Sequence, residues 1–313
     1  MSIKYVMESY ELLDSPSVCG KDVRRALMEV GIGAEAIEVK TVEGPNGHTD
    51  FVKVWFEGKK GKRGGGAAPT LGIVGRLGGI GARPERIGLV SDADGAVAAV
   101  AVALKLGAMA KLGDLLEGDV FVSTHICPDA PTRPHDPVPF MDSPINMQIA
   151  NAEEMNPDLD AVLSIDTTRG NRVINHRGFA ISPTVKEGYI LRTAEDLLDV
   201  MSYVTGKAPV VFPITTQDIT PYGNGLYHLN SILQPCTATG APVVGVALTA
   251  ETAVPGCATG ASQVSDIEAV VRFAIEVGKA FGEGKLRFYD PLEFERLLKL
   301  YGPMKHLQTL GRN

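Results

Sequence analysis

Short, continuous apolar runs recur along the chain, separated by longer segments of mixed polarity. Runs of this kind are typical of strands that are buried on both faces of a sheet. They predict strands at residues 69–74, 118–122, 161–165, 210–214 and 242–248. Two more strands are predicted at residues 36–41 and 50–57, the second from alternating apolar positions.

Between these runs, apolar residues recur at the spacing of an amphipathic helix. The pattern predicts a helical segment at residues 8–31 with a turn at 15–17, and helices at residues 94–112, 195–204, 222–232 and 265–281. Ser265, with Glu268 three residues later, has the spacing of a capping box at the start of the last one. Alternation of strands and helices favours an α/β fold with a mostly parallel sheet and helices on both faces. No linker divides the chain, so we expect a single domain over residues 1–313.

Composition narrows the class of protein. Hydrophobic residues make up 44% and charged residues 21%, which is ordinary for a globular chain, and the net charge is −7. An acidic surface argues against nucleic acid as a partner, because phosphate binding needs a cationic face. No apolar run is long enough to span a bilayer, and the four cysteines form no CxxC pair. We therefore expect a cytoplasmic protein with no membrane partner, and the sequence is compatible with a homo-oligomer.

Polar side chains stand where several of the predicted strands end. These are Arg76, Asp92, His125 and Asp166. Strand ends of a parallel sheet share one edge, which is where α/β proteins bind ligands. Each residue also has a purely structural interpretation, since an Asp at a helix start suits the helix dipole and a buried His is commonly satisfied by its neighbours.

Two loops carry cysteine with small hydroxyl and glycine residues. They are residues 236–240 and 257–260. Such loops leave backbone N–H groups free for an anion, and paired thiols could act as acid and base. The alternative is a pair of tight turns beside buried thiols.

The order of these features resembles the zinc exopeptidase superfamily of aminopeptidases, aminoacylases and carboxypeptidases. The resembling segments are residues 12–30, 50–54, 92–99, 118–122, 164–166, 216–218, 240–246 and 266–270. The resemblance implies an exopeptidase-like fold in which Asp92 bridges metal ions and Asp166 is a further metal carboxylate. Core elements account for the stretch between these two residues, which leaves no room for a lid domain.

The chain departs from that superfamily at several ligands. Gly75-Arg76-Leu77 stands where a His-x-Asp motif is expected, no Glu lies at residues 127–129, and no His lies at residues 255–259. The chain also resembles an uncharacterised bacterial family of about this length, through residues 75–79, 124–128 and 216–222.

Three functions follow as hypotheses. The first is a metal-dependent hydrolase of a peptide or a small amide or carboxylate, using Zn or Mn to activate water. Its metal ligands would be Asp92, Asp166, His125 and His228. Its general base would be Asp94 or Asp129, and its substrate would be held by Arg76, Arg83 and Asn224.

The second hypothesis is a metal-free isomerase or lyase of a small carboxylate. Cys127, Cys236 or Cys257 would act as acid, base or nucleophile, and the Arg76 loop would bind the anion. The third is a non-catalytic binding or scaffold protein whose metal site has decayed.

Overall fold

The computed structural model describes residues 1–76, 80–81, 88–134, 140–168, 170–254, 256–257 and 260–311. In this part of the chain, nine strands form one sheet in the order β1-β2-β4-β3-β7-β11-β9-β10, with β8 also paired to β11. They are β1 (Ile37–Gly44), β2 (Gly47–Phe56), β3 (Leu71–Gly75), β4 (Val120–Ile126), β7 (Ala161–Thr168), β8 (Gly178–Ile181), β9 (Val185–Lys186), β10 (Tyr189–Ile190) and β11 (Val243–Thr249). Two short strands, β5 (Thr132–Arg133) and β6 (Phe140–Met141), pair separately.

The sheet is mixed, which corrects the prediction of a mostly parallel one. Its four central strands, β4, β3, β7 and β11, run parallel. On one side, the β1–β2 hairpin pairs antiparallel with β4. On the other, β8, β9 and β10 make antiparallel pairings around β11. A hairpin needs only a short turn, so it adds strands to a parallel core with few connecting residues. The strands that it adds run antiparallel to their neighbours.

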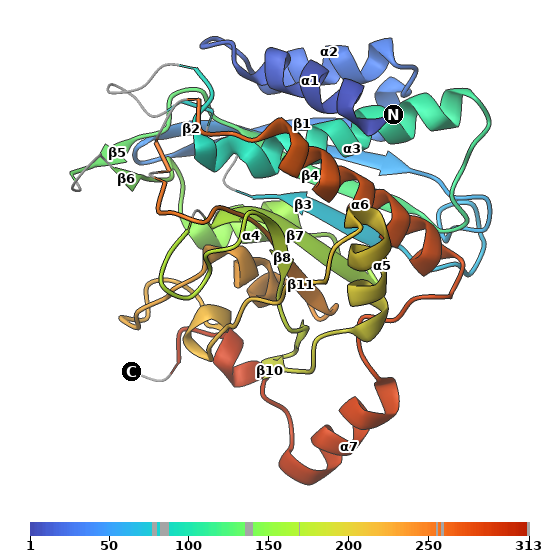
Figure 1. Ribbon diagram of the computed structural model, residues 1–313, viewed down its shortest axis with the longest axis vertical. Coiled ribbons are helices and arrows are strands. Elements are labelled where there is room, and N and C mark those ends of the chain that lie inside the picture. Colours follow the sequence, from blue (N-terminus) through green and yellow to red (C-terminus); the bar gives the residue numbers. More distant parts are fainter. Residues whose placement is uncertain are drawn as a thin grey trace.

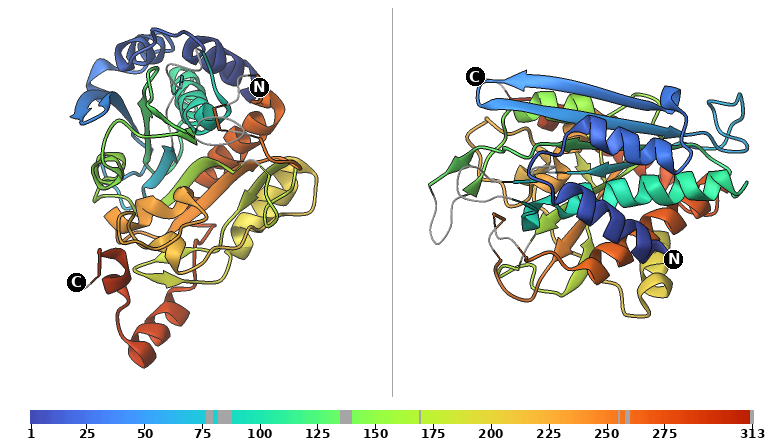
Figure 2. Two further views of the ribbon diagram at one scale, coloured as in Figure 1. Left: turned by 90° about the vertical axis from the view of Figure 1, so that its left-hand side faces the viewer. Right: turned by 90° about the horizontal axis from the view of Figure 1, so that it is seen from above.

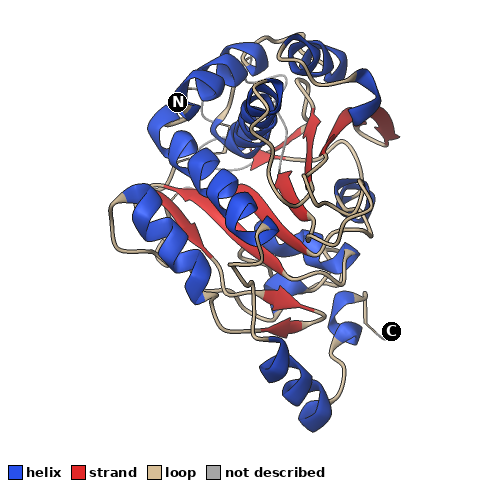
Figure 3. Cartoon of the chain, turned by 90° about the vertical axis from the view of Figure 1, so that its right-hand side faces the viewer, coloured by secondary structure: helices blue, strands red, loops and turns tan. Residues whose placement is uncertain are grey.

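Helices cover both faces of the sheet, as predicted (Figures 1 and 3). The α-helices are α1 (Ser2–Leu13), α2 (Gly20–Glu29), α3 (Asp94–Lys111), α4 (Met147–Glu154), α5 (Glu195–Thr205), α6 (Val264–Gly282) and α7 (Pro291–Tyr301). Helices α1, α2, α3, α5 and α6 share one apolar core with the sheet. The opposite face is covered by α4 and by the 3₁₀ segments η3 (Gln217–Ile219) and η4 (Ser231–Ala238), over a second core.

Helix α3 lies at the centre of the larger core. It is apolar almost all round, as expected of a helix enclosed on every side. Together with the short η2 segment (Ser91–Ala93) it is long and apolar enough to cross a membrane by length and composition alone, but 83% of its apolar 18-residue window is buried inside the fold. It is therefore a core helix, and its apolar residues are explained by packing.

Two glycines allow the start of α3 to touch the ends of two strands. A Cβ at Gly95 would lie 2.6 Å from the Arg76 carbonyl oxygen and 2.7 Å from that of Ile165. A Cβ at Gly75 would collide with the Gly95 carbonyl group in turn. This close approach holds the Asp92 turn against the ends of β3 and β7.

The chain's one tryptophan, Trp55, lies on β2 opposite Phe121 of β4. The two rings pack at 4.8 Å between centroids, and the Arg63 guanidinium lies 4.4 Å from the Trp55 ring centre. The other end of the same strand pair, at Asp50 and Ile126, points towards the cavity described below.

Two local predictions were wrong. Residues 222–230 form turns and residues 231–232 begin η4, because Asn224 and Asp218 bond to backbone groups of that segment and so compete with an α-helix. Residues 210–214 make only an isolated bridge, between Val211 and Ile181. The strand predicted at 118–122 is present as β4 and extends to Ile126, which leaves His125 at its end.

Candidate functional site

A cavity of about 1040 Å³ opens at the end of the sheet where β3, β4 and β7 finish. Among the described residues, its wall includes parts of the loop after β4, the start of α4, the segment at residues 222–231, and Val254 and Gly256. Of the residues predicted from sequence, Arg76, Asp92, His125, Cys127 and His228 line it. Segments distant in sequence therefore meet here, as the views down and across the sheet show (Figure 2).

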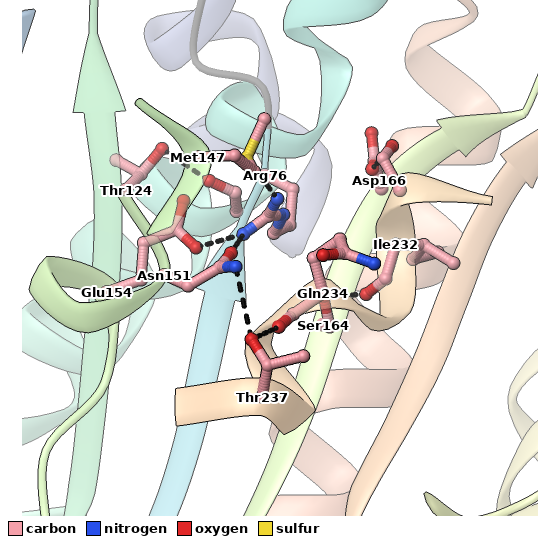
Figure 4. A network of polar contacts seen from close by, with 12 residues as sticks. Arg76, Thr124, Met147, Asn151, Glu154, Ser164, Asp166, Ile232, Gln234 and Thr237 are labelled. Atoms are coloured by element: carbon pink, nitrogen blue, oxygen red, sulfur yellow. Dashed lines mark hydrogen bonds and ion pairs between the residues drawn. The ribbon is translucent and has the colours of Figure 1, made fainter. Parts of the chain in front are cut away.

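Arg76 follows β3 directly and is 1% exposed. Its Nη1 donates to Asn151 Oδ1 at 2.7 Å and to the Glu154 carboxylate, both from α4 (Figure 4). Glu154 is also 1% exposed, and burial raises its pKa, with the neighbouring Arg76 cation acting against that rise. The pair ties α4 to the centre of the sheet at the cavity wall.

Asp92 and Asp166 lie close enough for their charges to interact. Thr167 links them: its N–H donates to Asp166 Oδ1 at 2.7 Å and its hydroxyl to Asp92 Oδ1 at 3.1 Å. Asp92 is partly exposed in the cavity, whereas Asp166 is 1% exposed behind the wall. Burial first, and then the Asp92 charge, raise the pKa of Asp166 to about 7. Asp166 therefore keeps its proton up to near neutral pH.

A chain of hydroxyl groups joins Asp166 to the cavity. Ser231, at the start of η4, donates its hydroxyl proton to Asp166 Oδ2 at 3.0 Å, and the Tyr222 hydroxyl is close enough to Ser231 for their side chains to interact. Burial raises the pKa of Tyr222 to about 12, so its hydroxyl keeps its proton. Both Ser231 and Tyr222 line the cavity, which gives the buried carboxyl a route to it.

His125 is held as a neutral ring. Its Nδ1 lies 2.9 Å from the Thr49 hydroxyl and its ring stacks on Phe51 at 5.2 Å. Burial, with a further contribution from the Arg76 cation, lowers the pKa of His125 to about 3. The residue can exchange hydrogen bonds with a ligand but does not carry charge at neutral pH.

The thiols are poorly suited to nucleophilic work. Cys127 lines the cavity and its pKa rises to about 11 through burial. Burial also raises the pKa of Cys236, to about 12, and Cys257 is completely buried. A thiol acts as a nucleophile through its thiolate, and burial works against that form here.

Three of the predicted site residues make contacts that hold the fold, and a fourth lies outside the cavity wall. Asp94, the first residue of α3, accepts a hydrogen bond from Ser262. Asp129 is exposed and lies outside the cavity wall. Asn224 donates to Thr220 Oγ1 at 2.8 Å and accepts from the Leu226 N–H at 2.9 Å. His228 lines the cavity, but its Nδ1 lies 2.9 Å from the Leu226 carbonyl and its Nε2 3.1 Å from Thr220. Arg83 lies outside the described residues.

Sequence reasoning missed Glu154, Asn151 and Ser231. The first two lie on the short helix α4, which follows a Pro-rich stretch, and Ser231 lies in a segment wrongly predicted as helix. A polar residue on the inner face of a short amphipathic helix is a weak signal, and nothing in the sequence pairs Arg76 with a residue 78 positions away.

Of the predicted metal ligands, Asp92 and Asp166 come together, whereas His125 and His228 do not join them. Among the described residues, no three His, Cys, Asp or Glu side chains come together in a way that could hold a metal ion. Asp92 and Asp166 are near each other, but His125 stands beside a buried cation and the His228 nitrogens face its own loop. This donor set does not fit a closed zinc site, which takes four ligands.

Comparison with curated proteins found no match. Comparison with family models matched residues 40–311 to the family described as "Protein of unknown function (DUF1177)". That match covers most of the chain and includes every residue of the cavity wall. The chain belongs to the DUF1177 family.

Proposed function

We propose that the cavity is the active site of an acid–base enzyme that hydrolyses a small amide or peptide with the Asp92–Asp166 pair. The observation that carries the proposal is the placement of two carboxylates around Thr167, one in the cavity and one behind its wall. A carboxylate beside a protonated carboxyl can take and give protons at the same pH, which is what amide hydrolysis requires.

The roles follow from exposure. Asp92 is the base in contact with the cavity, and it accepts a proton from water as the water oxygen attacks the amide carbon. In the structure Ser231 donates to Asp166 Oδ2. In the reaction its hydroxyl turns to the substrate, donates its proton to the carbonyl oxygen and receives the Asp166 proton in return. When the C–N bond breaks, the amine leaves with the proton held by Asp92. The carbonyl re-forms, and its proton returns through Ser231 to Asp166.

Three single variants test these roles. Asp92→Asn removes the base, Ser231→Ala breaks the route from Asp166, and each should lower kcat on a panel of N-acyl amino acids and dipeptides by about 100-fold or more. Asp129→Asn is the matched control, because that carboxylate is exposed and outside the cavity wall. Wild-type turnover that survives Asp92→Asn would rule out the acid–base assignment.

A metal-dependent form of the hydrolase is the second candidate, favoured by the same two carboxylates. Metal analysis of the purified protein separates the two. Stoichiometric zinc or manganese that is lost in Asp92→Ala would favour the metal enzyme. Activity that persists after chelation, and still depends on Ser231, would favour the acid–base enzyme.

A further inference from the structure

Arg76 has more hydrogen-bond donors than its neighbours use. A guanidinium group presents five N–H donors in one plane. Nη1 is satisfied by Asn151 and Glu154. Within the part of the chain that the structure describes, Nε is buried without a hydrogen-bond partner, and Nη2 meets only the thioether sulfur of Met147, at 3.1 Å. The fork formed by Nε and Nη2 thus lacks an oxygen acceptor.

This unmet fork belongs to a side chain that lines the cavity. A thioether is a weak acceptor, so the sulfur contact returns little of what it costs to bury a cation. Met147 is at the first turn of α4, is only partly buried, and also lines the cavity. Methionine is unbranched and adaptable, so it can move aside for a group that bonds better.

The surrounding charges set the conditions for such a group. Glu154 from α4 compensates Arg76 on its other side, while His125 from β4 and Tyr222 from the 222–231 segment are neutral. Asp92 before α3 and Asp166 from β7 add carboxyl groups to this region, and the Arg133–Asp142 ion pair lies in the cavity wall. Asp218 from η3 is buried and accepts hydrogen bonds from the Leu229 and Asn230 N–H groups. An anion at the fork would meet the Arg76 cation directly and would accept charge-assisted hydrogen bonds from Nε and Nη2.

We propose that the Nε–Nη2 fork of Arg76 binds the carboxylate of a small ligand, with Met147 as a cover that the ligand displaces. A planar carboxylate matches a guanidinium fork with two parallel hydrogen bonds. Ile145, Met141 and Val254 of the same wall give the rest of the ligand an apolar surface. The inference rests on the proposed function in one respect, because it names a carboxylate as a feature of that enzyme's substrate.

Calorimetric titration with isovalerate tests the site without a known substrate. Isovalerate should bind the full-length protein, and the neutral amide isovaleramide, which has the same shape, should bind at least about tenfold more weakly. Inorganic phosphate distinguishes a carboxylate site from a general oxyanion site. No binding of isovalerate, equal binding of isovaleramide, or tighter binding of phosphate would each overturn the proposal.

Variants locate the binding at the fork. Arg76→Lys keeps the charge but loses the planar fork, and should weaken isovalerate binding at least about tenfold. Arg76→Lys also disturbs a buried ion pair, so Met147→Ala is a second, independent test. Removing the Met147 side chain uncovers the fork and should tighten isovalerate binding several-fold. Ile149→Ala is its control, a truncation on the same helix at an exposed position. Equal affinities in Met147→Ala and Ile149→Ala would contradict the role of Met147.

A comparison of binding with turnover separates this inference from the proposed enzyme. Ser231→Ala should abolish most of the hydrolysis and leave isovalerate affinity within about twofold, because Ser231 bonds to Asp166 whereas the Arg76 side chain bonds to residues of α4. Isovalerate binding that depends on Arg76, together with turnover that survives Ser231→Ala, would keep the carboxylate site and count against the acid–base pair.

Discussion

At the scale of single residues, the site contains two buried ionisable groups that make stability depend on pH in opposite directions. The pKa of Asp166 is raised from 3.8 to about 7, so the folded state binds more protons than the unfolded state in that range, and stability falls as the pH rises through it. The pKa of His125 is lowered from 6.5 to about 3, so the folded state binds fewer protons, and stability rises with pH over that range. The two effects largely cancel between about pH 4 and 6.5.

Replacing either group should reveal the pH dependence of stability that the other group contributes. Relative to wild type, Asp166→Asn should gain stability as the pH rises from about 4 to 7, by up to about 4 kcal/mol, because the variant no longer has to ionise a buried carboxyl. His125→Gln should instead gain relative to wild type as the pH falls below about 6.5. Urea unfolding across this range measures both differences. Two difference curves with the same slope would show that burial does not shift these groups as described.

At the scale of elements, sequence pattern predicted the long, strongly periodic segments and failed on the short ones. Helices α3, α5 and α6 and the buried strands β3, β7 and β11 were predicted close to their bounds, because apolar spacing alone determines them. Helix α4 was missed, and the loop at residues 222–230 was taken for a helix, because local side-chain bonds from Asn224 and Asp218 outweigh its periodicity. The contact between Arg76 and Glu154 depends on α4, so the sequence pattern could not predict that part of the site.

The contact between α3 and the strand ends gives a prediction for this scale. Ala is a better helix former than Gly by about 1 kcal/mol, so propensity alone would make Gly95→Ala stabilising. The neighbouring carbonyls of Arg76 and Ile165 leave no room for a Cβ, and we expect a net loss of at least about 2 kcal/mol in the free energy of unfolding. Gly240→Ala is the control, because a Cβ there meets no atom within 4 Å. If thermal unfolding shows the two variants to be alike, the close approach is not a constraint.

At the scale of the whole molecule, α7 stands apart from the layered body (Figure 1). Its one buried residue, Phe294, packs edge-on against Tyr189 and Tyr289 at 5.9 and 5.7 Å, with Lys186 5.3 Å from its ring. Because the contact is small, this region should open separately from the sheet. Phe294→Ala should speed hydrogen exchange in α7 at least about tenfold while exchange in β3 and β7 stays slow. Leu292→Ala, at a position 78% exposed, should leave hydrogen exchange unchanged in α7 and in the sheet. A uniform rise across the sheet would mean that α7 is part of the main cooperative unit.

The position of Trp55 has a spectroscopic consequence. The protein has one indole, and it lies between Phe121 and Arg63 at the end of β2 away from the cavity. Its fluorescence should therefore change when the sheet comes apart and stay constant when the cavity fills. A single emission band then measures folding alone, and ligand occupancy can be followed in the same sample by a second label without cross-talk between the two signals.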